Sequence, residues 1–417
     1  MRLVSRFEGE LAHHHAYRVT FPLAVALTVP GLLVRIGIFE LPLVWEALSF
    51  GLAIMGAAFM LSWAAEVAQL DISQTLAIAV LALIAVLPEY AVDLYLAFCA
   101  GRGLDPRCHD EAIANMTGAN RLLIGVGWAV VVLIYWLKSG NKKVVLRREQ
   151  RTDVGFLLIA TLWAFTVPVR GQLSLFDLAI LGGLFLVYIS RAAREEVEAP
   201  DLIGAAAAIG ALPKTTRRVV VIVMFLFAAT VILASAEPFV HSLRGIGERF
   251  GISRFLLIQW VAPLASESPE MIIAILFTLR LKAQAGLGTL ISSKVNQWTL
   301  LVGTLPLVFS LAGAGLTPFT LSPVQKEEVF LTAAQSLFAV AVIANLSISR
   351  TEAVGLLVLF FGQFAIPVPA VRIGFGIGYL ILAAGMFAFN AGVRESLIDS
   401  LRHVFRPRRR PSGEPGT

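Results

Sequence analysis

The chain has 417 residues, of which 57% are hydrophobic and 15% are charged, and its mean hydropathy is +0.79. A soluble domain carries about 25% charged and about 45–50% apolar residues, so this composition excludes a soluble protein and indicates a polytopic membrane protein. The net charge of +6 comes from Lys and Arg in the loops and in the tail at 406–410. This pattern is typical of anchoring to anionic lipid and not of nucleic-acid binding.

A helix needs about 20 apolar residues to cross the hydrocarbon core of a bilayer, and twelve stretches approach or exceed that length. The predicted spans cover residues 19–38, 43–66, 74–100, 112–137, 154–169, 173–190, 218–238, 253–279, 286–312, 329–348, 353–369 and 372–392. We therefore expect an all-α protein with about twelve transmembrane helices.

Basic residues orient these spans. Most of the Lys and Arg residues in the loops follow even-numbered spans, as in the basic loop at 138–151. Five arginines that follow odd-numbered spans are exceptions, namely Arg102, Arg107, Arg244, Arg249 and Arg254. The positive-inside rule predicts an integral protein of the plasma (inner) membrane with both termini in the cytoplasm.

A Pro-Glu step occurs twice inside apolar stretches, as Pro88-Glu89 and as Pro269-Glu270. Each step is costly, because proline removes a helical hydrogen bond and the carboxylate lies where water is absent. One span later each copy has an asparagine with a glycine seven residues on, Asn120 in the first copy and Asn296 in the second. This repetition predicts one duplicated ion site.

The two copies begin five spans apart, an odd number, so they insert in opposite orientations, as in the inverted repeats of secondary transporters. The predicted fold is therefore two inverted five-helix repeats with a flanking helix at each end. The predicted divisions are 1–40 for the cytoplasmic N-terminus and extra helix, 41–191 for the first repeat, 192–216 for a cytoplasmic loop, 217–371 for the second repeat, and 372–417 for the final helix and basic cytoplasmic tail.

The two stretches resemble the alpha-repeats of the cation/calcium antiporter superfamily, which has the sodium/calcium exchanger fold. In that family a Gly-Thr-Ser-Leu-Pro-Glu step precedes a Gly-Ser-Asn-Ile-Phe-Asn/Asp step on the next helix. The corresponding residues here are 84–89 and 265–270, then 117–120 and 292–296. The resemblance covers spans two to eleven. It implies that Glu89 and Glu270 are the central cation ligands and that Asn120 and Asn296 close the site.

The chemistry of these residues agrees with that implication. Ca²⁺ takes six to eight oxygen ligands from carboxylates, amides and carbonyls. Two buried carboxylates close together repel each other unless a cation or a proton lies between them, which is a physical basis for exchanging a cation against H⁺. Asp93 lies one helical turn after Glu89 and is either a secondary ligand or proton relay, or the partner of an arginine or a loop.

The second copy keeps a serine at Ser266 and has Glu267 in place of the next family serine. Ser292 lies four residues before Asn296 and is a further candidate oxygen ligand. In the first copy the corresponding Thr and Ser are Ala85 and Val86, which weakens the case for exchange of three sodium ions.

Lys294 lies two residues before Asn296, and a buried ammonium is expensive unless it is paired. We expect it to pair with Glu267 and to modulate the charge of the site. Such a pair could also lock the site, which gives the alternative of a transport-inactive regulatory or scaffold protein.

Other chemistries find little support. The sequence has no P-loop, no Cys/His spacing suited to zinc and no nucleophile–base set, so we expect neither an enzyme nor a cofactor. Cys99 and Cys108 flank a short loop and are compatible with a disulfide or with two free thiols. The function that we expect is secondary active antiport of Ca²⁺ or Na⁺ against H⁺ or another cation across a lipid bilayer. The oligomeric state stays open.

Overall fold

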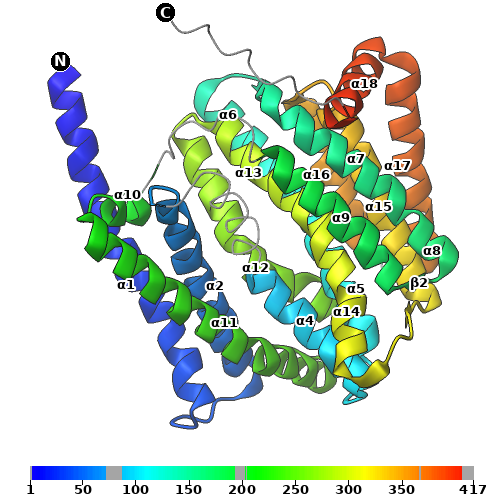
Figure 1. The fold of residues 1–417 in the computed structure, drawn as a ribbon, viewed down its shortest axis with the longest axis horizontal. Helices are drawn as coiled ribbons and strands as arrows, with labels where there is room; N and C mark the ends of the chain where they lie inside the picture. The colour runs from blue at the N-terminus through cyan, green and yellow to red at the C-terminus, as the bar shows by residue number, and fades with distance from the viewer. Residues whose placement is uncertain (1, 72–86, 193–201, 203, 366–367, 406–417) are drawn as a thin grey trace, which may run out of the picture.

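A computed structural model describes residues 2–71, 87–192, 202, 204–365 and 368–405, and helices account for most of them (Figure 1). The helices of the first half are α1 (Arg2–Arg35), α2 (Leu43–Ala68), α4 (Leu87–Arg102), α5 (Cys108–Leu122), α6 (Ala129–Ser139), α7 (Arg151–Ala164), α8 (Thr166–Arg170), α9 (Leu175–Ala192) and α10 (Gly204–Gly210). Those of the second half are α11 (Lys214–Phe250), α12 (Arg254–Leu279), α13 (Ala283–Asn296), α14 (Val302–Phe309), α15 (Pro323–Ile343), α16 (Arg350–Ala365), α17 (Pro369–Phe389) and α18 (Ala391–Phe405).

Among the described residues, eight helical stretches are long and apolar enough to cross a membrane. They are Leu43–Ala68, Cys108–Ser139, Arg148–Arg170, Leu175–Ala192, Lys214–Phe250, Arg254–Leu279, Ala283–Ala314 and Pro369–Phe389. The predicted spans at 19–38, 329–348 and 353–369 also coincide with helices, in α1, α15 and α16. The predicted span at 74–100 is helical from Leu87, and its earlier part lies outside the described residues. The all-α polytopic prediction is confirmed.

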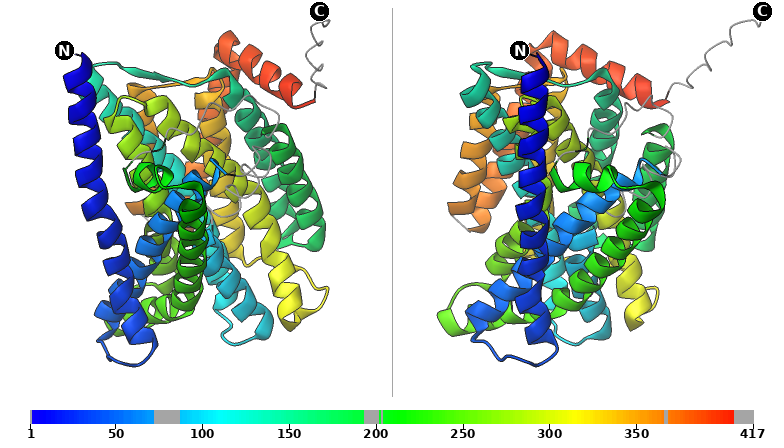
Figure 2. Two further views of the ribbon diagram at one scale, coloured as in Figure 1. Left: turned by 60° about the vertical axis from the view of Figure 1, so that its left-hand side comes forward. Right: turned by 90° about the vertical axis from the view of Figure 1, so that its left-hand side faces the viewer.

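The helices form a small group along one side of the molecule and a larger group beside it (Figure 1). The helices α1, α2 and α11 pack together along one side of the molecule, and α12 lies between this group and the remaining helices (Figure 1). The long apolar helices run in roughly the same direction as one another, whereas α18 lies across one end of the bundle (Figure 2). Both Pro-Glu steps therefore lie in the interior, on α4 and α12, and not at the edge of the bundle.

Small residues allow two helices to approach α12 closely. A Cβ atom at Gly118 of α5 would lie 1.8 Å from the backbone oxygen of Gln259, and one at Gly286 of α13 would lie 2.5 Å from that of Ala274. Real side chains do not tolerate such distances, so glycine is required at both contacts. Close packing through small residues is the usual way in which membrane helices associate.

Two short β-ladders join loops that are distant in the sequence. The strand β1 (Lys143–Val145) pairs antiparallel with β4 (Ser347–Ser349), and β2 (Gln172–Leu173) pairs antiparallel with β3 (Phe319–Thr320). The first ladder joins segments that follow the fourth and tenth predicted spans, and the second joins segments that follow the fifth and ninth. Each ladder therefore lies at one end of the bundle, which agrees with the alternating order of the spans.

Candidate ion-binding site

Three glutamates form the centre of the candidate site. Glu89 lies in the first turn of α4, whereas Glu267 and Glu270 lie about one turn apart on α12. All three are buried, with exposed fractions of 2%, 2% and 8%. Their positions follow from the two Pro-Glu helices, which the fold brings into contact.

The backbone of α12 continues through both of its prolines, Pro263 and Pro269. Pro269 has no N–H to donate to the carbonyl oxygen of Ala265 four residues earlier. The hydroxyl of Ser268 donates to that oxygen instead, over 3.3 Å. The carbonyl oxygen that the proline frees thus accepts a hydrogen bond from a neighbouring side chain.

The carboxyl groups of Glu89 and Glu267 lie within hydrogen-bonding reach of each other. Neither oxygen of Glu89 and only one oxygen of Glu267 receives a hydrogen bond from the described residues, the donor to Glu267 being Gln297 Nε2 at 2.8 Å. Two carboxylates cannot bond to each other unless a proton or a cation lies between them. This pair is therefore the place in the described structure where charge compensation is most clearly required.

Glu270 has a different environment. The hydroxyl of Ser293 on α13 donates to Glu270 Oε2 over 2.6 Å. The sequence predicts the adjacent Ser292 as a candidate ligand, but this residue is partly exposed and its hydroxyl shares no hydrogen bond with another described residue. The other predicted serine, Ser266, donates within its own helix to the carbonyl oxygen of Ala262 over 3.3 Å.

Lys294 is fully buried, and its ammonium binds the side-chain oxygen of Asn120 on α5. It lies 4.4 Å from the centre of the Trp298 ring, which adds a cation–π contact. Glu89 and Glu267 are its acidic neighbours, but no ion pair within 4 Å joins Lys294 to either. The predicted Glu267–Lys294 pair is therefore wrong, because the amide of Asn120 and the ring of Trp298 hold the ammonium while Glu267 accepts from Gln297.

The remaining predicted residues lie around this centre. Asn296 Oδ1 accepts from the hydroxyl of Tyr90, over 3.3 Å. Asp93 is fully buried and accepts from Asn115 Nδ2 over 2.9 Å, so its described partner is an amide and not an arginine. Sequence reasoning missed Tyr90, Asn115, Ser293 and Gln297, although each is a polar residue in a span that carries a predicted ligand.

Within the described part of the chain, no group of three or more His, Cys, Asp or Glu side chains is arranged to hold a metal ion. The acids thus form a polar site without the geometry of a resident metal centre. A transported ion would have to draw the two Pro-Glu helices closer or use carbonyl and amide oxygens as further ligands.

The helices that follow the two asparagines share an irregularity. A π-helical segment occurs at η1 (Leu123–Trp128) after Asn120, and another at η3 (Gln297–Leu301) directly after Asn296. Single π-turns inside α-helices are rare and occur frequently at functional sites. Their presence after the matching asparagines of the two copies is a further sign of the internal repeat. The sequence predicted the repeat but not these π-helical segments.

A buried ionic network lies on the other side of α5. Arg121, the residue after Asn120, pairs with Glu328 of α15 and lies 5.0 Å from the ring centre of Trp260. Glu328 also accepts from Gln259 over 2.9 Å and pairs with Arg372 of α17 over 3.1 Å. The network fixes the position of α5 and with it the orientation of Asn120.

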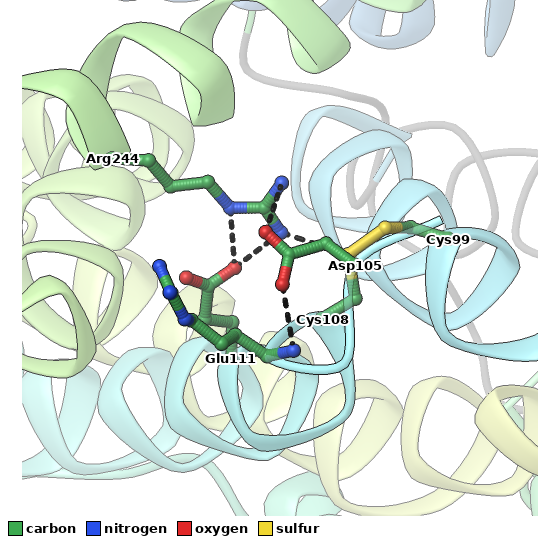
Figure 3. Close-up of a disulfide and its surroundings, with 6 residues drawn as sticks. Cys99, Asp105, Cys108, Glu111 and Arg244 are labelled. Atoms are coloured by element: carbon green, nitrogen blue, oxygen red, sulfur yellow. Dashed lines mark hydrogen bonds and ion pairs between the residues drawn. A yellow bond between two sulfur atoms is a disulfide. The ribbon is translucent and has the colours of Figure 1, made fainter. Parts of the chain in front are cut away.

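At one end of α5 a disulfide joins Cys99 to Cys108, with 5.8 Å between their Cα atoms. Figure 3 shows Arg244 of α11 reaching toward the same region, where its Nε donates to Glu111 over 2.7 Å. A terminal nitrogen of Arg244 also lies 3.8 Å from Asp105. Of the two alternatives that the sequence left open for the cysteines, the structure contains the disulfide.

These features define a polytopic membrane protein with a buried cluster of acidic side chains on α4 and α12. The family model described as "Sodium/calcium exchanger protein" matches residues 41–193 and 220–367. The chain therefore belongs to the sodium/calcium exchanger protein family, whose members are transporters and not enzymes.

Among solved structures, the chain is similar to the H⁺/Ca²⁺ exchanger CAX, with 42% sequence identity and a TM-score of 0.89 over 93% of this chain and 97% of that one. It is also similar in fold to the Ca²⁺/H⁺ antiporter protein YfkE, with 17% identity and a TM-score of 0.59 over 88% of this chain and 100% of that one. The sodium-calcium exchanger NCX_Mj gives 16% identity and a TM-score of 0.52 over 78% and 99%. A search of curated proteins found no match.

Proposed function

We propose that this chain is a secondary active antiporter that exchanges Ca²⁺ or Na⁺ for H⁺ or another cation by alternating access. The observation that carries the proposal is the contact between the buried carboxyl groups of Glu89 and Glu267, which come from the two Pro-Glu helices. The similarity of the whole chain to an H⁺/Ca²⁺ exchanger that is 42% identical favours Ca²⁺ and H⁺ as the exchanged pair.

In this proposal the site alternates between two neutralised forms. In one form a proton lies between Glu89 and Glu267, and in the other a cation replaces it and recruits Glu270, which Ser293 orients. Asn120 and Asn296 supply amide oxygens, and Asp93 lies one turn further along α4 as a secondary ligand or relay. The site changes its exposure from one side of the membrane to the other at low cost only when its charge is neutralised by a proton or a cation. This requirement couples the movement of the two ions.

The alternative of a locked scaffold requires Lys294 to neutralise Glu267. The ammonium binds Asn120 instead, and Glu267 keeps one oxygen without a hydrogen bond from the described residues. Lys294 then acts as a fixed neighbouring charge that modulates the site and leaves the carboxylates available. This arrangement favours transport over the locked alternative.

The proposed placement is an integral protein of the plasma membrane with both termini in the cytoplasm. The basic loop that contains β1 lies at the end joined by the first ladder, whereas the disulfide lies in a loop after an odd-numbered span. Disulfides persist on the oxidising side of a membrane, which agrees with this orientation. The two blocks matched by the family model support the proposed division into repeats at 41–191 and 217–371.

Flux measurements in proteoliposomes test the proposal. An imposed pH gradient is expected to drive ⁴⁵Ca²⁺ uptake, and Glu89→Gln or Glu270→Gln is expected to reduce that uptake at least about tenfold, because each removes a charged ligand worth more than about 1.4 kcal/mol. Glu395→Gln, on the exposed face of α18, is the matched control and should leave uptake unchanged. If the parent protein moves none of Ca²⁺, Na⁺, K⁺ and Mn²⁺, antiport is excluded and the regulatory role is favoured.

A further inference from the structure

A groove lies on the membrane-facing side of α7, α8 and α9, far in the sequence from the Pro-Glu steps. Its volume is about 630 Å³, and aromatic and aliphatic side chains dominate its lining, including Phe156, Ile159, Trp163, Ile180 and Leu184. Because these helices belong to predicted membrane spans, the groove opens toward the acyl chains of the bilayer. Its apolar wall suits a hydrocarbon chain.

Gly183 forms part of the hollow. A Cβ atom placed at Gly183 would have no neighbouring atom within 4 Å, so the space beside this glycine is not filled by protein. A larger side chain here would occupy the groove without displacing the protein around it. The position therefore offers a way to fill the groove selectively.

The helix α18 closes one end of the groove with Val404 and Phe405. It lies across the end of the bundle and packs on α7, where Gly155 approaches Val404 (Figure 2). Its buried residues, Val393, Ser400 and Val404, recur at helical spacing, and charged residues such as Arg394 and Glu395 are exposed. Such an amphipathic helix is suited to the surface of a membrane. The closed end of the groove thus lies at the level where lipid headgroups begin.

Basic residues gather at this closed end. Arg191 is part of the lining and donates to the backbone oxygen of His403 over 3.4 Å. A second cavity of about 510 Å³ is lined by Arg148, Glu149, Arg151 and His403. Among the described residues here, the two acids Glu149 and Asp399 accompany four arginines, Arg148, Arg151, Arg191 and Arg402. Asp399 pairs with Arg151 over 3.3 Å and with Arg402 over 3.7 Å. The described residues at this end of the groove therefore carry an excess of positive charge.

We propose that the groove and its basic end bind one anionic phospholipid, with an acyl chain between α7 and α9 and the phosphate near Arg191. Basic pockets between membrane helices at the cytoplasmic side are typical binding places for anionic headgroups. The apolar groove and the basic end suit the same lipid molecule, because Arg191 is part of the lining of the apolar groove. A free anion in water would use the arginines but would gain nothing from the apolar wall.

The test compares lipid retention in native mass spectrometry of the purified full-length protein mixed with dioleoylphosphatidylglycerol or dioleoylphosphatidylcholine. The parent is expected to retain phosphatidylglycerol in preference to phosphatidylcholine. Gly183→Leu should abolish that preference by filling the groove, and Ile180→Trp provides a second way to fill it. Gly378→Leu on α17 is the matched control, because its added Cβ also meets no atom within 4 Å.

Arg191→Gln is expected to weaken phosphatidylglycerol binding about fivefold, as follows from the loss of one arginine near a headgroup. Arg394→Gln, on the exposed part of α18, should leave it unchanged. Equal retention of the two lipids by the parent, or parental retention by both groove-filling variants, would overturn the proposal. Displacement of phosphatidylglycerol by millimolar inorganic phosphate would show a site for a free anion instead. This binding readout is independent of ion flux.

Discussion

The hydroxyl of Ser293 donates directly to Glu270, whereas the hydroxyl of the neighbouring Ser292 has no hydrogen bond with the described residues. Successive residues on a helix differ by about 100° in direction, so only one of two adjacent serines can point at a given partner. The contact orients one carboxylate oxygen of the proposed site. Removal of the Ser293 hydroxyl should therefore lower the affinity for the cation without disrupting the fold.

Ser293→Ala is expected to lower the apparent affinity for Ca²⁺ at least about tenfold, because a hydrogen bond to a charged group contributes about 1.5–3 kcal/mol. The measurement is the Ca²⁺ dependence of initial uptake in proteoliposomes. Ser292→Ala is the matched control, and its affinity should equal that of the parent. If Ser292→Ala shows the larger loss, the geometry described for Glu270 does not operate during transport.

At the residue scale the sequence pointed to the glutamates and asparagines, because a Pro-Glu step in an apolar span is conspicuous; the structure buries all four, and their role as ligands stays a proposal. It did not indicate Ser293, whose hydroxyl and not that of the predicted Ser292 contacts Glu270, because one residue of helical register decides which serine faces α12. It also gave Lys294 the wrong partner. A lysine has a long side chain, and the choice between Glu267, Asn120 and the Trp298 ring depends on how α5 approaches α13, which the sequence does not show.

Between elements, an ion pair connects the end of α2 to the start of α11. Arg217 donates to both oxygens of Asp71, over 2.8 and 3.0 Å, and Arg218 donates to one of them over 3.3 Å. The Arg217 guanidinium holds the pKa of the Asp71 carboxyl below its ordinary value. The two helices begin corresponding halves of the molecule, so this contact couples the two repeats at one end.

The pH dependence of stability follows from the lowered pKa. Since the folded protein binds the Asp71 proton less readily than the unfolded chain, the contact stabilises above the unfolded pKa of about 3.9 and the stabilisation is lost as the pH falls through the folded value. Asp71→Asn is expected to lower the Tm in detergent at pH 7, and the difference from the parent should shrink as the pH is lowered toward 3.

Two further variants control for this effect. Arg217→Gln should reproduce the loss of Tm at pH 7, whereas Arg218→Gln should have a smaller effect because Arg218 is more exposed and its ion pair is better screened. A difference in Tm between Asp71→Asn and the parent that stays constant from pH 7 to pH 3 would contradict the assignment of the effect to this carboxylate.

The positions of most helices could be predicted, because long apolar stretches dominate the sequence. The π-helical segments at η1 and η3 and the two β-ladders could not. A π-turn has no strong residue signature of its own, and the ladders depend on loops being brought together by the bundle. Both are consequences of packing between helices and not of local propensity.

For the molecule as a whole, the two ends of the bundle differ in chemistry. One ladder holds the basic segment around β1. The disulfide and the Arg244–Glu111 contact instead join helices α4, α5 and α11 near the loop that follows the third predicted span. The all-α polytopic fold was accessible from the sequence, because long apolar stretches and the distribution of charge extend over the whole chain, whereas the exact number of spans stays a prediction. Whether the cysteines were joined depended on their spatial distance.

Labelling of intact cells tests the orientation. The described residues contain no free cysteine, so a single new cysteine at an exposed position can be followed against that background. Leu104→Cys, in the loop closed by the disulfide, is expected to react with a membrane-impermeant maleimide in intact cells. Lys142→Cys, in the basic loop, should react only after permeabilisation. The reverse pattern would place the termini outside.

The bond between Cys99 and Cys108 has a consequence for how the protein can move. It covalently links α4, which carries Glu89, to α5, which carries Asn120, so these two helices cannot separate at that end. The contact between α5 and α11, by contrast, is held at that end by Arg244 and its acidic partners, and water can replace these ionic interactions. We therefore expect any opening on this face to occur between α5 and α11. In that movement α11 would move away, while α4 and α5 stay together as one rigid unit.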